Sequence, residues 1–311
     1  MNRRPGITLV EVLVAIFIMG IGMIALLTLF PLGALNVAQA LKDDRAAQAA
    51  ANANAHAIAQ DLRHDTNVLN AFTAQLVPPN AAVTPAFDPK GPSGPVYVDP
   101  FYFVLNQTTL GGVTRISPSY APGGNAPQMA FWFSLLDDLY YDPTGVPTIS
   151  AGPTVTRSGR FTWAYMLRRP RLGDQSVVDM SVVVYADRVT QTALGETSYT
   201  ANSFPVGTPP TNTLTLNYSG LTKPKIRNGS WILDVTPDIA TNAATGKTYT
   251  IPRGYFYRVV DASEDSTNTI FTLELQTPLK AAVPGTPGSA FTIIVMENVV
   301  EVFDRGSGYI P

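Results

Sequence analysis

A single carboxylate, Glu11, stands inside a long apolar run near the start of the chain. Residues 7–35 read ITLVEVLVAIFIMGIGMIALLTLFPLGAL, and Glu11 is the only charged residue among them. A carboxylate inside a membrane-spanning helix costs about 2.5 kcal/mol or more unless it finds a partner. We therefore expect Glu11 either to pair with a positive charge or to reach water from the start of the helix.

The other titratable residues offer little for catalysis. The chain has no cysteine, and its two histidines, His56 and His64, both fall in an alanine-rich stretch. Eight residues apart on a helix, they lie two turns from each other and cannot share a metal ion, so we interpret them as surface histidines. The rest of the chain has neither histidine nor cysteine for a catalytic triad, and no glycine-rich nucleotide-binding pattern occurs. We predict that the protein is not an enzyme.

Two acidic clusters could offer oxygen ligands to calcium: Asp137, Asp138 and Asp142, and Asp261, Glu264 and Asp265. The second cluster begins like a calcium-binding loop. It lacks the glycine required at the sixth position, however, and has Thr272 where a bidentate glutamate is needed. We interpret both clusters as solvated turns, keep Asp261 and Asp265 as weak calcium candidates, and predict no other cofactor. The formal net charge of −2 provides no basic surface for nucleic acid.

The apolar run is long enough to cross a membrane. Its 29 residues would span about 43 Å as a helix, against roughly 30 Å of hydrocarbon in a bilayer. Arg3 and Arg4 precede it, and positive charge at that end predicts an N-terminus in the cytoplasm and a body outside. A secretory signal peptide is the first alternative, but its apolar region is usually half as long and is followed by small residues.

The segment from Pro5 to Glu11, PGITLVE, resembles the processing site of type IV pilins and pseudopilins. That family has a short basic leader ending in glycine, then a hydrophobic residue, often Thr-Leu, and a glutamate at the fifth position after the glycine. Arg3, Arg4, Gly6, Thr8, Leu9 and Glu11 match this pattern. The sequence departs from it at Ile7, where the family most often has phenylalanine.

The resemblance implies a processing and assembly route. A prepilin peptidase that is also a methyltransferase would cleave after Gly6 and methylate the new amine of Ile7. When subunits stack, the ammonium of one would meet the Glu11 carboxylate of its neighbour, so that two charges that are costly alone neutralise each other. The other partners implied are pilin-like subunits, an inner-membrane assembly platform with its ATPase, and membrane lipid before assembly.

The helix is expected to continue beyond the apolar run, over residues 36–64, as the outer half of a pilin-like stem. Its alanine content and its apolar positions at i, i+3 and i+4 favour this. Pro31 lacks a backbone donor, and Gly33 follows closely. We expect a kink or a locally extended segment between Gly20 and Gly33, with a straight helix that tolerates the proline as the alternative.

The head, residues 65–311, reads as β structure separated by Pro- and Gly-rich turns. We divide it into a first β-rich region at 65–189, a linker or long loop at 190–213 and a second β-rich region at 214–311. The expected fold class is therefore α+β, with a leader at 1–6, a stem at 7–64 and a large, mainly antiparallel head.

Together these features predict a pilin or pseudopilin subunit of a filament that serves type II secretion, adhesion, motility or DNA uptake. It would sit in the cytoplasmic membrane as a single-pass precursor and later reach the periplasm or cell surface. The alternative is a membrane-anchored β domain that never polymerises and binds glycan or an envelope protein.

Overall fold

The structure is a computed structural model of the 311-residue chain. It describes residues 9–74, 95–99, 109–110, 113–120, 132–135, 161–169, 177–188, 196–202, 211–241, 248–265, 269–280 and 291–309. Contacts between residues divide the chain into two compact units, Met1–Arg45 and Ala46–Pro311.

One long helix, α1 (Leu9–Ala59), includes both the apolar run and part of the alanine-rich stretch. Pro31 lies inside α1, and the helix is continuous from Gly20 through Gly33. No extended segment interrupts the described helix there, and a kink at Pro31 and Gly33 stays a prediction.

The helix ends five residues earlier than predicted, at Ala59 rather than at His64. Asp61 adopts a left-handed backbone conformation (φ 48°), which is incompatible with a continuing right-handed helix. A short 3₁₀ helix, η1 (Leu62–His64), and a second α-helix, α2 (Thr66–Ala74), follow. The Asp65 carboxylate caps α2 by accepting hydrogen bonds from the backbone N–H groups of Asn67 (2.9 Å) and Val68 (3.2 Å).

The larger unit contains a six-stranded sheet with the order β14-β5-β4-β1-β3-β2. Its strands are β1 (Val96–Val98), β2 (Thr109–Leu110), β3 (Val113–Ile116), β4 (Phe161–Arg168), β5 (Val177–Ala186) and β14 (Val299–Tyr309). Every pairing is antiparallel except that between β1 and β3. The predicted mainly antiparallel β structure is therefore confirmed, and the fold class is α+β.

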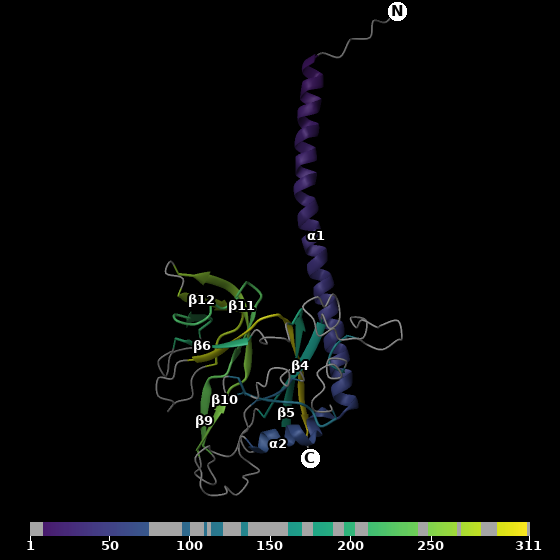
Figure 1. Cartoon of the computed structure of the whole chain (residues 1–311). Helices are drawn as coiled ribbons and strands as arrows, with labels where there is room; N and C mark the ends of the chain where they lie inside the picture. The colour runs from purple at the N-terminus through teal and green to yellow at the C-terminus, as the bar shows by residue number, and fades with distance from the viewer. Residues whose placement is uncertain are drawn as a thin grey trace, which may run out of the picture. The chain divides into compact units, whose positions relative to one another are not determined.

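Six further strands close into a barrel with the order β11-β12-β7-β6-β13-β8 (Figure 1). They are β6 (Glu196–Ala201), β7 (Thr213–Asn217), β8 (Trp231–Asp234), β11 (Tyr255–Glu264), β12 (Ile270–Leu275) and β13 (Phe291–Met296). The two-stranded ribbon of β9 (Pro237–Thr241) and β10 (Thr248–Pro252) lies between β8 and β11 in the sequence.

The barrel strands are inserted in the sequence between two neighbouring strands of the sheet, β5 and β14. Two boundaries of the predicted head are therefore wrong. Strand β6 lies inside residues 190–213, which had the polar, aperiodic composition of a linker, and it pairs with β13, 90–100 residues away in the sequence. Strand β14 falls in the predicted second region but pairs with β5 of the first, because the chain returns to the sheet at its end.

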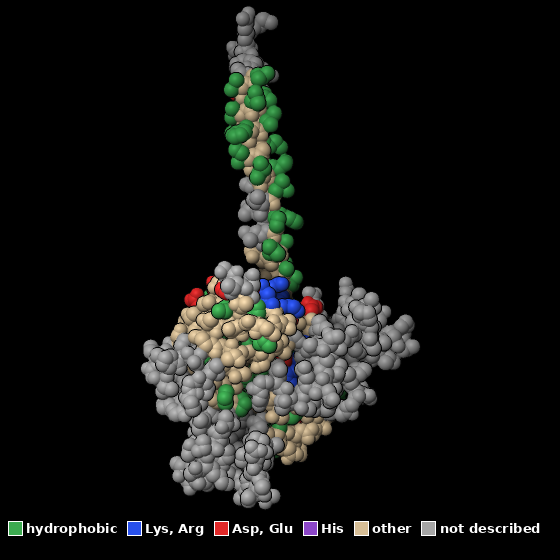
Figure 2. Space-filling view, turned by 60° about the vertical axis from the view of Figure 1, so that its left-hand side comes forward, with side chains coloured by type: hydrophobic (Ala, Val, Ile, Leu, Met, Phe, Trp, Pro, Cys, Tyr) green, Lys and Arg blue, Asp and Glu red, His purple; other side chains and the backbone are tan. Residues whose placement is uncertain are grey.

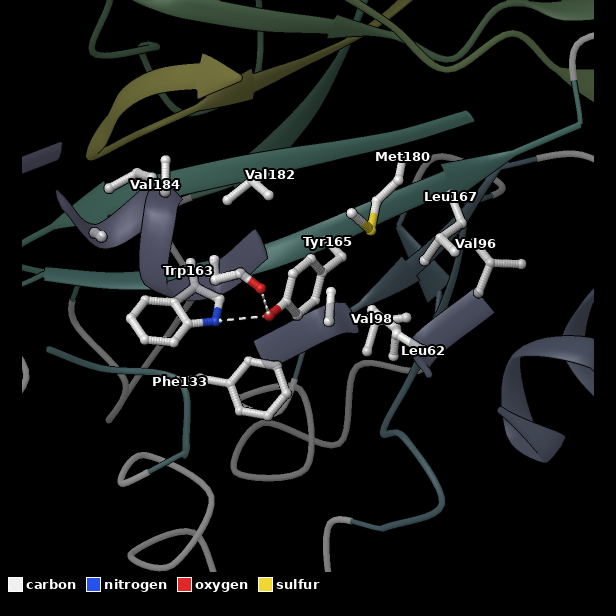
Figure 3. Packing of buried hydrophobic residues seen from close by; sticks show 14 of the residues in the cluster. Leu62, Val96, Val98, Phe133, Trp163, Tyr165, Leu167, Met180, Val182 and Val184 are labelled. Atoms are coloured by element: carbon white, nitrogen blue, oxygen red, sulfur yellow. Dashed lines mark hydrogen bonds between the residues drawn. The ribbon is translucent and has the colours of Figure 1, made fainter. Parts of the chain in front are cut away.

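Central strands β4 and β5 are buried on both faces, as expected for a sheet covered on two sides. One face packs against the alanine side of α1, formed by Ala46, Ala49, Ala50, Ala53 and Ala57. The small alanine side chains let the helix backbone approach the large residues of the sheet. Figure 3 shows these sheet residues, with Trp163, Tyr165 and Leu167 from β4 beside Met180, Val182 and Val184 from β5.

The opposite face of the sheet packs against the barrel. Ala164, Met166, Val183 and Tyr185 share one buried cluster with residues of strands β8 and β13 and of the segment that follows β8. The sheet is thus the middle layer of the larger unit, with the alanine side of α1 on one face and the barrel on the other.

Candidate functional site

The first part of α1 presents an almost uninterrupted apolar surface. Every described side chain from Leu9 to Asp44 is exposed, and the large ones include Phe17 (68% exposed) and Phe30 (79%). Hydrophobic side chains cover the described part of this helix in Figure 2. A helix that is apolar all round is typical of a segment that is buried by something else, either protein or lipid.

Among the described residues, no helix combines the length and the apolar character needed to cross a membrane. The membrane-spanning role of residues 7–35 stays a prediction.

Glu11 lies in the first turn of α1 and is exposed. The N-terminus of a helix carries a partial positive charge, which stabilises a nearby carboxylate by about 0.3–1 kcal/mol. This position therefore places the Glu11 carboxylate at the positive end of the helix without burying it. Gly6 and Ile7, the predicted cleavage and methylation residues, lie outside the described residues.

The two weak calcium candidates take part in local turns. The Asp265 carboxylate accepts hydrogen bonds from the backbone N–H groups of Thr269 and Ile270, both at 2.9 Å. The Asp261 carboxylate accepts one from the Asn228 side chain at 3.2 Å. Across the part of the chain that the structure describes, no group of three or more potential ligands could hold a metal ion. The first acidic cluster, at residues 137–142, lies outside those residues.

The two histidines have different surroundings, and the prediction that both lie on a free helix surface is wrong for His56. His64 contacts the carboxylate of nearby Asp61. The His56 ring packs against Tyr120, Trp132 and Phe133, with ring centroids 5.4–5.7 Å apart. These partners come from segments distant in the sequence, so helical spacing gave no signal for them.

Hydrogen bonding fixes the tautomer of His56. The Tyr165 hydroxyl donates to the backbone carbonyl of Ala53 (2.8 Å) and accepts from the Trp163 indole N–H (3.1 Å), two bonds that Figure 3 shows. Because its proton is used, Tyr165 can only accept from His56 Nδ1, at 3.3 Å. The other ring nitrogen, Nε2, is buried without a hydrogen-bond partner. Burial lowers the pKa of His56, so the structure favours the neutral ring.

Sequence reasoning also missed a group of charged side chains buried inside the larger unit. Asp99, Arg115, Arg188 and Glu196 are each at most 8% exposed, and each arginine lies within ion-pair distance of both carboxylates. They are spread over almost 100 residues of sequence. Only the pairing of the strands brings them together.

Residues 1–27 match the family model described as the prokaryotic N-terminal methylation motif. This motif is the prepilin-type cleavage and methylation segment of type IV pilins and pseudopilins. No curated protein matches the chain.

The match confirms the resemblance seen at Gly6 to Glu11. It supports a pilin-like or pseudopilin precursor with a processed N-terminus, a structural type of protein that is typically not an enzyme. It also implies processing by a prepilin peptidase, assembly with other pilin-like subunits and a membrane-anchored precursor.

Proposed function

We propose that the protein is a structural subunit, of pilin or pseudopilin type, in a filament built on its N-terminal helix. The observation that carries this proposal is the placement of Glu11. It lies in the first turn of an exposed apolar helix and inside the matched N-terminal segment, residues 1–27.

Cleavage after Gly6 leaves an ammonium on Ile7, four residues before Glu11. When helices stack and apolar surface is buried, the ammonium of one subunit and the Glu11 carboxylate of its neighbour would offset each other's cost of burial where they meet. The pair therefore favours one register between subunits over others.

The apolar surface of α1 supplies the main attraction in this assembly. The free energy gained by burying such a surface is roughly proportional to the apolar area removed from water. Before assembly the same surface would be covered by lipid of the cytoplasmic membrane, with the N-terminus in the cytoplasm and the head outside. Extraction and stacking would need an inner-membrane assembly platform and its ATPase. After assembly the head would be displayed in the periplasm or on the cell surface.

The large head, with a sheet and an inserted barrel, favours a minor or pseudopilin-like subunit over the main building block of a shaft. Type II secretion and a type IV pilus-like system are both consistent with this role. We propose neither a bound cofactor nor a nucleic-acid partner for the head.

The mature N-terminus and the role of Glu11 are tested together in cells that make the filament. Mass spectrometry of the protein from its native envelope should show a chain that begins with N-methylated Ile7. Glu11→Ala should still be cleaved but should fail to enter filaments, because the neighbouring ammonium then has no partner. Asp43→Ala is the matched control, since Asp43 is an exposed acid of the same helix outside the apolar run. It should assemble normally.

An intact MNRRPG leader, or normal filaments with Glu11→Ala, would contradict the proposal. Either result would favour the alternative of a membrane-anchored β domain that does not polymerise and binds glycan or an envelope protein through its head.

A further inference from the structure

The inserted barrel is joined to the sheet by two chain crossings that lie side by side. The chain leaves β5 at Ala186 and returns to β14 after Asn298, and the Ala186 N–H donates to the Asn298 carbonyl at 2.8 Å. Asp187 (φ 52°) and Asn298 (φ 66°) are both in the left-handed region. Asp and Asn tolerate this region, and hinges between domains typically consist of a few residues at the ends of elements, as here. The described part of the junction therefore has the geometry of a two-strand hinge.

Apolar contacts alone would not fix the barrel at such a hinge in one orientation. The cluster between sheet and barrel is made of residues such as Met166, Val183, Leu233 and Ile294. Contacts of this kind are favourable but non-directional, and methionine in particular adapts to different neighbours. Directional interactions, such as hydrogen bonds and ion pairs, are needed to select one orientation of the barrel.

Four buried charged residues supply such bonds. Asp99 follows β1 and Arg115 lies in β3, so both belong to the sheet, while Glu196 is the first residue of barrel strand β6. Arg188 lies at the exit crossing, directly after Asp187. The group contains two guanidinium groups and two carboxylates, so its formal charge is zero.

Each arginine holds a carboxylate of the sheet and the carboxylate of the barrel at once. Arg188 donates to both oxygens of Asp99 (2.9 and 2.7 Å) and to Glu196 (3.3 Å). Arg115 donates to Asp99 (3.2 Å) and also contacts Glu196. Removing either arginine would leave the two buried carboxylates with less positive charge to neutralise them, which is costly inside a protein.

Two tyrosines of the sheet extend the network on its other side. The Tyr185 hydroxyl donates to Glu196 at 3.0 Å, so Tyr97, which contacts the same hydroxyl, must donate to Tyr185. The Arg188 guanidinium also lies 4.0 Å from the centre of the Tyr185 ring. Glu196 is thus held by groups from β3, β5 and the exit crossing, which together define a single position for the start of the barrel.

We propose that Asp99, Arg115, Arg188 and Glu196 form an ionic lock that holds the inserted barrel in one orientation on the sheet. With the lock closed, a force on the sheet is transmitted directly to the barrel. With the lock broken, the barrel remains folded around its own core but moves on the hinge. The inference does not depend on filament assembly.

The test uses the full-length protein in detergent, with two cysteines introduced for nitroxide spin labels. Because the natural chain has no cysteine, Ala55→Cys on α1 and Thr272→Cys on barrel strand β12 are labelled selectively. Both positions are exposed. The parent protein should give one narrow distribution of distances between the two labels.

Arg188→Met should abolish that single narrow distance, while amide hydrogen exchange shows that the strands of sheet and barrel remain protected. Glu196→Gln, a smaller change, should broaden the distribution in the same way. Lys223→Met is the matched control, because it breaks an exposed ion pair with Glu264 within the barrel (2.7 Å) and should leave the distance unchanged.

An unchanged narrow distance in both lock variants would overturn the proposal. Loss of protection throughout the sheet and barrel in both would also overturn it, because the network would then maintain the fold rather than the orientation of the barrel.

Discussion

Gly254→Ala should destabilise the protein through a close contact between the barrel and the sheet. Gly254 precedes β11 and has a left-handed backbone (φ +68°). An added Cβ would lie 2.8 Å from both Cβ and Cγ of Pro95, which precedes β1 in the sheet, and 3.6 Å from Met166 Sδ. The left-handed conformation costs an alanine about 1–2 kcal/mol. Overpacking against the Pro95 ring adds about 1–3 kcal/mol, because the ring cannot rotate away. The expected total is about 2–5 kcal/mol.

Gly220→Ala is the matched control for the backbone contribution. Gly220 is also left-handed (φ +76°), but a Cβ added there would meet nothing within 4 Å. Its substitution should cost only the conformational part, about 1–2 kcal/mol. The reduced flexibility of the unfolded chain affects both variants alike and cancels in the comparison.

Urea unfolding of both variants, followed by circular dichroism, measures the two losses in free energy. Gly254→Ala should lose about 1–3 kcal/mol more than Gly220→Ala, with similar m-values. Equal losses would show that the close approach of Gly254 to Pro95 does not contribute, and would refute the reasoning.

Three further predictions concern single side chains of the larger unit. Burial lowers the pKa of His56 in the folded protein, so as the pH falls below about 6.5 this histidine is protonated first in the unfolded chain. The free energy of unfolding should therefore decline by up to about 1.4 kcal/mol per pH unit until the pH reaches the pKa of the folded state. His56→Gln should flatten this part of the profile in urea midpoints measured from pH 7.5 to 4.5, and an unaltered slope would argue against it. Asp65→Ala should cost about 1–3 kcal/mol, because the buried carboxylate caps α2 and also accepts the Ser119 N–H at 2.8 Å; a thermal midpoint equal to that of the parent would contradict this. Asp265→Ala should lower the free energy of unfolding by about 1 kcal/mol with or without calcium, because the Asp265 carboxylate already accepts backbone hydrogen bonds in the turn before β12. If calcium raised the thermal midpoint of the parent but not that of the variant, a calcium site would be established instead.

The predicted β structure of the head agrees with the observed strands best where the local sequence pattern is strong. The alternation of Phe271, Leu273 and Leu275 with polar residues predicts a half-buried strand, and β12 has that pattern. The long helix follows in the same way from its apolar and alanine-rich composition. Its end at Ala59 could not be predicted. The left-handed residue after a helix is usually glycine, whereas here it is Asp61.

Errors in the predicted organisation of the head arose where partners are distant in the sequence. A polar strand such as β6, ETSYTA, has little pattern of its own and is defined by its pairing with β13 and β7. The same holds for β14, which no local signal assigns to the sheet rather than to the barrel. Insertion of one domain into another therefore cannot be seen in composition or periodicity.

The sequence by itself determined the N-terminal site: the basic leader, Gly6, the apolar run and the single acid within it. These features act through linear order and hydrophobicity, so adjacent residues define them completely. Only the tertiary structure decided the surroundings of His56, the approach of Gly254 to Pro95 and the lock around Glu196. Burial changes the cost of a charge or a Cβ atom, and the identity of the atoms that surround a residue depends on which distant segments the fold brings together.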